Sequence, residues 1–135
     1  MVRTIQLRIG VAEHILSHAR SEPRIECCGL LAGAGGVITT IFPATNALAS
    51  ATAYEIAPQE LFELFRSMRS QGFEHLGIYH SHPAGDNAPS PSDIEQAFYP
   101  DVAYFIISPR MDAPRPLRAF SIAYGLVLEL EIKIE

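Results

Sequence analysis

The chain has 135 residues, of which 48% are hydrophobic, and its formal net charge is −5 with ten basic residues against fifteen acidic ones. This balance is typical of one globular domain, 1–135, that buries a core without disulfides, and it excludes the basic stripe of a nucleic-acid partner. No apolar run approaches the roughly 20 residues that span a bilayer, so no membrane partner is expected.

The cysteines and the N-terminal residues indicate a compartment. Cys27 and Cys28 are adjacent and cannot link distant segments, so we expect them to pack in a strand as small hydrophobic residues. Residues 1–16 lack an uninterrupted apolar segment and a cleavage signal, so no secretory peptide is expected. These features predict a cytoplasmic protein, and they leave open whether it is a monomer or a homodimer.

The first third of the chain is predicted to contain three strands and a helix. Alternating apolar residues predict a strand over 4–9, and helical periodicity follows over 11–20. The apolar face of that helix would carry Val11, Ile15, Leu16 and Ala19. Two apolar runs, 27–33 and 37–42, are separated by two glycines and predict a buried hairpin.

A second helix and two more strands are predicted in the middle of the chain. The helix would begin at Pro58, which suits a first helical turn, and end at Gly72. Its apolar face would carry Leu61, Phe62, Phe65 and Met68. Strand character returns at 75–82, and the near-continuous apolar run 102–108 is typical of a strand buried on both faces.

The C-terminal tail is predicted to form two strands around Gly125, the second with strict alternation of apolar and charged residues. Strands and helices are therefore mixed, with antiparallel hairpins towards both ends of the chain. We expect an α/β or α+β fold in which about three helices cover one mixed sheet.

Two of the five histidines, His80 and His82, stand on either side of one serine at the end of strand 75–82. Side chains at i and i+2 point to the same face of a strand, so the two imidazoles can bind one metal ion. No histidine follows His82, which excludes sites that add a histidine further along the chain. Neither His-Glu-x-x-His nor Cys-x-x-Cys occurs.

A carboxylate is the remaining choice for a third ligand, and Asp93 is better placed than Asp86 or Glu95. The run from Ser90 to Asp93 is typical of a helix start, which would fix Asp93 to a rigid element. Two histidines and one aspartate leave a fourth tetrahedral position for water, which is the arrangement of a catalytic zinc site.

Each half of this pattern also has an ordinary structural explanation. A His-x-His pair alone is more often a solvated strand end, and Ser90-x-x-Asp93 alone is a capping pattern. His14 and His18 lie four residues apart on the first helix and could also share a metal. Glu13 precedes His14 instead of following it, so the zinc-protease pattern fails and both histidines are expected to be boundary residues.

The complete pattern resembles the JAMM (MPN+) motif of the Mov34/MPN/PAD-1 metallopeptidases. The matching residues are His80-Ser-His82-Pro83, six further residues, and Ser90-x-x-Asp93. ECCGLLAG at 26–33 is similar to the glutamate-bearing strand of that family, with Glu26 in the place of its glutamate. The resemblance covers nearly the whole chain, in the minimal prokaryotic form that lacks the insertions with which eukaryotic relatives grip ubiquitin.

The resemblance implies a fold like that of cytidine deaminases, with a curved mixed sheet and helices on its faces. It implies that His80, His82 and Asp93 bind one Zn²⁺. It also implies that Glu26 is the general base that passes a proton from the attacking water to the leaving amine, and that Ser90 hydrogen-bonds the oxyanion. The residues alone do not distinguish Glu26 from the ten other glutamates.

The resemblance also implies a substrate. Residues 45–62 are similar to bacterial peptidases that act at the Gly-Gly tail of a ubiquitin-like or sulfur-carrier protein, releasing an amino acid such as cysteine or an isopeptide-linked lysine. Such a tail would bind as an added strand on a sheet edge beside the zinc, with loop 83–89 as one wall and Tyr54 as a candidate contact. Two alternatives stay open: a metal-free MPN scaffold module, and a zinc hydrolase of another amide-type bond.

Overall fold

The computed structural model describes residues 3–135, so the first two residues of the predicted domain 1–135 lie outside the described part. The elements are β1 (Thr4–Leu7), α1 (Ile9–Ser21), β2 (Cys28–Ala34), β3 (Val37–Ala44), α2 (Pro58–Ser70), β4 (Glu74–Ser81), α3 (Pro91–Glu95), β5 (Ala103–Ile107), β6 (Leu117–Ala123) and β7 (Leu126–Ile134). The predicted mixture of strands with three helices is confirmed. None of the helices in residues 3–135 has the length and apolar character needed to cross a membrane.

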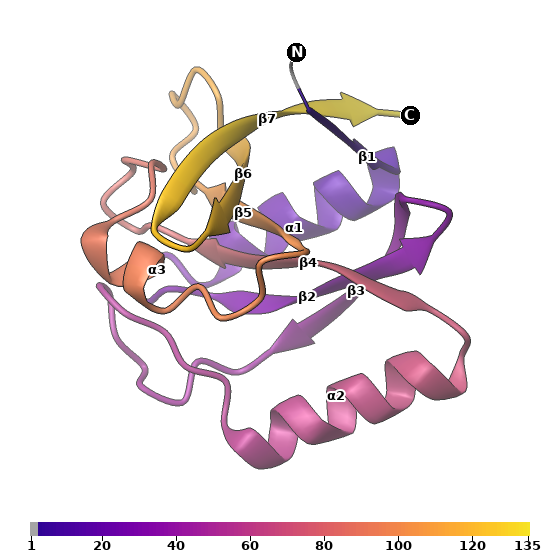
Figure 1. The fold of residues 1–135 in the computed structure, drawn as a ribbon. Helices are drawn as coiled ribbons and strands as arrows, with labels where there is room; N and C mark the ends of the chain where they lie inside the picture. Colours follow the sequence, from indigo (N-terminus) through magenta and orange to yellow (C-terminus); the bar gives the residue numbers. More distant parts are fainter. Residues whose placement is uncertain (1–2) are drawn as a thin grey trace.

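The strands form one sheet in the order β1-β3-β2-β4-β5-β6-β7, and this sheet closes into a barrel (Figure 1). β2–β3 and β6–β7 are antiparallel hairpins, as predicted, whereas β4 and β5 pair in parallel. β1 pairs in parallel with both β3 and β7, with Ile5 opposite Ile132, and so joins the two hairpins. The sequence did not predict this closure, because the pairing connects segments at opposite ends of the chain.

α1 covers one face of the sheet and lies between β1 and β7 on one side and β2, β3 and β4 on the other (Figure 1). Its buried residues include Val11, Ile15 and Ala19, as the periodicity predicted, and Leu16 is half-buried. The core that they join contains side chains from all seven strands, such as Phe105 of β5. β4, which carries His80 and ends directly before His82, is therefore fixed by packing along most of its length.

α2 covers the opposite face (Figure 1). Met68 is buried, and Leu61, Leu64 and Phe65 pack against this second core. The prediction was wrong for Phe62, which is 60% exposed. A helix turns by about 100° per residue, so the apolar stripe through 61, 65 and 68 includes 64 and leaves 62 facing solvent.

Cys27 and Cys28 are buried free thiols where β2 begins, as predicted. Burial raises the pKa of the Cys27 thiol to about 11 and that of Cys28 to about 12. Both thiols are therefore protonated at neutral pH, and they act as small core side chains instead of nucleophiles or metal ligands.

Candidate metal centre and active site

The candidate site lies where β2 begins and β4 ends. Their antiparallel pairing sets Cys28 opposite His80, and the same register places Glu26 opposite His82. The ladder continues past the strand end, because the Ser81 amide donates to the Cys27 carbonyl oxygen (3.0 Å) and the Cys27 amide donates to Ser81 Oγ (2.9 Å). The strand alternation predicted from the sequence therefore places both histidines on one face.

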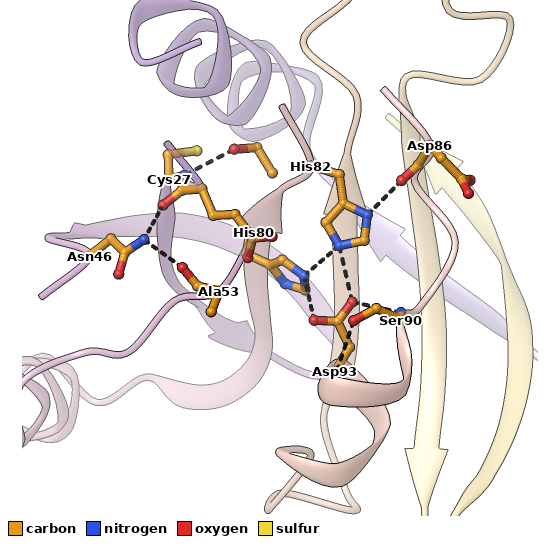
Figure 2. Close-up of polar contacts among 10 residues, drawn as sticks. Cys27, Asn46, Ala53, His80, His82, Asp86, Ser90 and Asp93 are labelled. Carbon is orange, nitrogen blue, oxygen red and sulfur yellow. Dashed lines mark hydrogen bonds and ion pairs between the residues drawn. The ribbon is translucent and has the colours of Figure 1, made fainter. Parts of the chain in front are cut away.

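Asp93 joins the two histidines in a single cluster (Figure 2). His80 Nε2 and His82 Nε2 are 3.1 Å apart, and they lie 3.1 and 3.0 Å from the two carboxylate oxygens of Asp93. Within residues 3–135 this is the one group of three or more His, Cys, Asp or Glu side chains that could hold a metal ion, with its ligand atoms within 4.8 Å of one another.

The lone pairs of this cluster fit a cation. His82 Nδ1 faces the backbone carbonyl oxygen of Asp86 and therefore donates to it, which leaves a lone pair on Nε2 (Figure 2). That lone pair faces His80 Nε2 and an oxygen of Asp93, and acceptors this close repel unless protons or a metal ion lie between them. Two imidazoles and one carboxylate are ligand types that zinc commonly takes, so the donor set is compatible with zinc.

The cluster shifts the pKa of each member. Burial alone would raise the pKa of the Asp93 carboxyl, but the contacts with both histidines and the hydrogen bond from the Ser90 amide outweigh burial and hold it well below its usual range. Burial lowers the pKa of His80 and outweighs the contact with Asp93. Burial opposes the charged form of His82 too, but the contacts with Asp93 and the Asp86 carbonyl raise its pKa overall. Asp93 is thus ionised and His80 neutral, the forms that bind a metal.

A capping box fixes Asp93 at the start of α3. Ser90 Oγ accepts from the Asp93 amide (3.1 Å), and Asp93 accepts from the Ser90 amide (2.9 Å). The capping interpretation is confirmed, and the Ser90 hydroxyl keeps its own proton to donate. The other two candidate ligands do not join the cluster: the carboxylate of Asp86 accepts from the Ala88 amide (3.3 Å), and Glu95 is exposed.

Glu26 is buried beside this cluster, with only 4% of its surface exposed. Its Oε1 has no hydrogen-bond partner within residues 3–135. Burial raises the pKa of the carboxyl to about 7, with nearby His82 lowering it and the charge of Asp93 raising it. A carboxyl whose pKa lies near neutral pH can both accept and return a proton during a reaction.

Asn46, which sequence reasoning missed, connects Glu26 to the segment that follows β3, and Figure 2 shows its contact with Ala53 of that segment. Its side-chain amide donates to the carbonyl oxygens of Glu26 (3.0 Å) and Ala53 (2.9 Å). Its Oδ1 accepts from the amides of Leu48 (3.0 Å) and Glu55 (3.2 Å). An asparagine after a strand is typical of any turn, so the sequence alone gave no signal for this role.

Tyr54 lies on the segment that Asn46 holds, and its ring stacks on His80 with the ring centroids 4.5 Å apart. It also lines a largely apolar hollow of about 290 Å³ between α2 and the residues after α3. Ile56, Leu61 and Phe98 are among the other lining residues. This hollow therefore adjoins the metal cluster on the side of His80.

The histidine pair on α1 is separate from the cluster. His18 Nδ1 lies 2.7 Å from the Tyr79 hydroxyl and its Nε2 lies 2.8 Å from Glu22, while His14 is exposed. His18 is therefore a boundary residue, as predicted, whereas His14 faces solvent.

Comparison with known proteins gives the family. The family described as prokaryotic homologs of the JAB domain matches residues 9–123. A desampylase from Haloferax volcanii is 38% identical over 78% of this chain and 81% of its own length. A CysO-cysteine peptidase from Mycobacterium tuberculosis is 32% identical over 98% of this chain and 92% of its own.

A solved structure agrees with the fold. The solution structure of a protein from Desulfitobacterium hafniense covers 97% of this chain and 92% of its own, with 34% identity and a TM-score of 0.83. The match of the family over most of the chain, the two relatives and the assembled His-His-Asp cluster agree with one another. The chain therefore belongs to the prokaryotic homologues of the JAB domain, the minimal prokaryotic form of the JAMM (MPN+) family that its motif predicted.

Proposed function

We propose that the protein is a zinc peptidase or isopeptidase that cleaves the bond after the Gly-Gly tail of a ubiquitin-like or sulfur-carrier protein. The observation that carries the proposal is the cluster of His80, His82 and Asp93 beside the buried Glu26. The similar desampylase and CysO-cysteine peptidase support this class of substrate. The single-domain organisation, the cytoplasmic location and the cytidine-deaminase-like description of the fold stay predictions within the same proposal.

Five residues have a role in the proposed reaction. His80, His82 and Asp93 would hold a zinc ion, which supplies a Lewis acid and lowers the pKa of water at the open position. The carboxylate of Glu26 takes a proton from the attacking water and returns it to the leaving amine. The Ser90 hydroxyl donates a hydrogen bond to the oxyanion, whose charge is absent in the substrate and develops as water adds to the carbonyl carbon.

We place the carrier tail on the side of Tyr54. The apolar hollow that Tyr54 lines can hold side chains of the tail, and glycines can approach the crowded cluster without a Cβ. The expected added strand would not lie directly beside β4, because β4 pairs with β2 on one side and β5 on the other. The backbone of the tail would instead run along the segment that contains Tyr54.

The test uses carrier tails that end in Gly-Gly or in Ala-Ala, each joined by an amide bond to the same amine. Zinc-loaded protein should cleave the glycine adduct at least tenfold faster, because a Cβ beside the metal cluster forces the backbone away. Chelated protein should cleave neither, and unrelated short peptides should be poor substrates.

The outcomes separate the alternatives. Zinc-loaded protein that cleaves both tails equally would favour a zinc hydrolase of another amide-type bond. Protein that binds no zinc, by metal analysis, would favour a metal-free scaffold.

A further inference from the structure

A second hollow, of about 300 Å³, borders the loop that follows His82. Gly85 and Asn87 line it from this loop, and three of the nine arginines of the chain line it from the β5–β6 connection and β6. These arginines are Arg110, Arg115 and Arg118. Asp86, between the two loop residues, is the residue whose carbonyl oxygen accepts from His82. One loop residue therefore separates the arginine-lined hollow from a proposed zinc ligand.

Specific contacts hold the arginines against this loop. Gly85 has a φ of +99°, and a Cβ at this position would collide with Cδ of Arg110, so glycine allows the close approach. Asn87 is buried, and its side-chain amide donates to the carbonyl oxygens of Arg115 (2.8 Å) and Ile106 (3.3 Å). The hollow is thus built into the fold and does not depend on mobile surface side chains alone.

The internal pairs of the hollow leave guanidinium donors available. Asp112 pairs with Arg110 (3.1 Å), and Glu129 pairs with Arg118 (2.8 Å) and Arg115 (3.0 Å). The carboxylate of Asp86 also lies near Arg118, so three guanidinium groups face three carboxylates. The side chains of Arg110 and Arg115 are 58% and 63% exposed, so they have donors within reach of a ligand.

The two hollows neighbour different histidines of the metal cluster. Tyr54 and the apolar hollow adjoin His80, whereas Asp86 and the arginine-lined hollow adjoin His82. A tail that enters past Tyr54 and is cut at the cluster would place its leaving group on the side of His82, where the arginines lie. A planar guanidinium matches a carboxylate with two parallel hydrogen bonds.

We infer that the arginine-lined hollow binds a carboxylate on the leaving group, so that the protein prefers substrates that release an anionic molecule. This inference rests on the proposed function. It concerns the leaving group, which lies on the other side of the cleaved bond from the Gly-Gly tail. The carboxylate has two possible sources. It is either the α-carboxylate of a single released amino acid or an acidic side chain beside a modified lysine in a peptide.

Four adducts of one synthetic peptide ending in Gly-Gly separate these sources. In the first pair the tail is joined to alanine or to alaninamide. In the second pair it is joined to the lysine side chain of a peptide in which glutamate or glutamine follows the lysine. Within each pair the leaving groups have nearly the same size and differ by one charge.

Zinc-loaded protein should cleave the anionic member of at least one pair about fivefold faster in kcat/KM, as one partly exposed guanidinium–carboxylate contact would give. Arg110→Gln and Arg115→Gln should each reduce this ratio towards one. Arg69→Gln is the matched control, because it removes the same charge from an exposed position on α2 and should leave the ratio unchanged. The pair that shows the preference identifies the source of the carboxylate.

A binding measurement makes the result independent of turnover. Glu26→Gln protein, which should not cleave the adducts, should bind the anionic member more tightly than the neutral one by calorimetry. Equal cleavage and equal binding within both pairs would overturn the inference while leaving the proposed function intact. A preference that Arg69→Gln also abolishes would show a general charge effect and overturn it as well. If zinc-loaded protein cleaves none of the adducts, the proposed function fails and the inference fails with it.

Discussion

Glu26 opposes the stability of the fold in which it lies. Its carboxyl is buried with an unpartnered oxygen, and its pKa is raised to about 7 from an ordinary value of 4.5. Between these two pH values, the folded protein therefore keeps a proton on the Glu26 carboxyl that the unfolded chain has already released. Stabilisation from the protonated form is complete below about pH 4.5 and is lost as the pH rises through about 7. This is the pattern of a residue kept for chemistry instead of stability.

We therefore expect Glu26→Gln to make the metal-free protein more stable at pH 8, by up to about 3 kcal/mol in the free energy of unfolding. The two proteins should have similar stability near pH 4.5, and the mutant should lose turnover by orders of magnitude while it retains zinc. Urea denaturation of chelated protein across this pH range measures the difference. A difference that does not change with pH would show that Glu26 titrates normally in the folded state.

At the residue scale, some members of the site could be predicted from the sequence and others could not. The spacing of His80 and His82 predicts their common face because strand geometry is local, and the helix-start pattern predicts how Asp93 is held. Glu26 is recognisable only through the family resemblance, because its position opposite His82 depends on a pairing between two distant strands. Asn46 gives no sequence signal, since its hydrogen bonds go to backbone groups that any residue type provides.

At the scale of elements, α3 is short, and the residue that caps it has two roles. Ser90 caps the helix and fixes Asp93, and the same hydroxyl is the proposed oxyanion donor. Ser90→Ala should lower the free energy of unfolding by about 1 kcal/mol through loss of the cap, whereas Ser90→Gly should cost only a few tenths. Both variants should retain zinc and lose about 10²–10³ in kcat, because both lack the hydroxyl.

Steady-state kinetics and thermal denaturation of these two Ser90 variants separate the tasks. Normal turnover in Ser90→Gly would show that the serine acts only as a cap.

The segment after β3 is a second element whose order depends on one side chain. Asn46→Ala leaves the buried carbonyl of Glu26 and the partly buried backbone groups of Ala53 and Glu55 without their partner, which should cost about 2–4 kcal/mol in the free energy of unfolding. Turnover should fall further than the folded fraction, because Glu26 and Tyr54 lose their common support, while zinc stoichiometry stays unchanged.

Ser50→Ala is the control for Asn46→Ala. It removes two hydrogen bonds inside the same segment, those of Ser50 Oγ with the Thr52 amide (3.1 Å) and with the Thr52 hydroxyl (3.3 Å), and leaves those of Asn46 intact. Equal activity losses in the two variants would mean that Asn46 only orders the segment.

At the scale of the whole molecule, the order of strands and helices is predictable and the closure of the sheet is not. Periodicity is local, so it locates each strand and the faces of α1. The pairing of β1 with β7 brings together residues near the two ends of the sequence, and no pattern in either strand specifies its partner. The exposed side of β7 shows the same limit, because Leu128 is 50% exposed although the alternation predicts an apolar face.

The position of the metal cluster outside the hydrophobic cores determines how the metal affects stability. The two hydrophobic cores that pack on the sheet exclude the metal cluster, so the fold does not depend on the ion as a zinc finger does. Chelation should therefore leave the far-UV circular dichroism spectrum nearly unchanged. Free zinc at a hundredfold excess over its Kd should add about 2.7 kcal/mol to the free energy of unfolding, which corresponds to roughly 10 °C in Tm.

Variants connect this stabilisation to the cluster. His80→Ala, His82→Ala and Asp93→Ala should each lose most of the one zinc ion expected per chain, and with it the zinc-dependent rise in Tm, because a three-ligand site has no spare donor. His14→Ala is the matched control: His14 is an exposed histidine of α1, and its loss should leave both zinc content and the rise in Tm unchanged. Metal analysis and thermal denaturation with and without chelator provide both readings. A rise in Tm that survives in His80→Ala would mean that zinc binds elsewhere, and unfolding on chelation would mean that the two cores cannot hold the barrel closed without the ion.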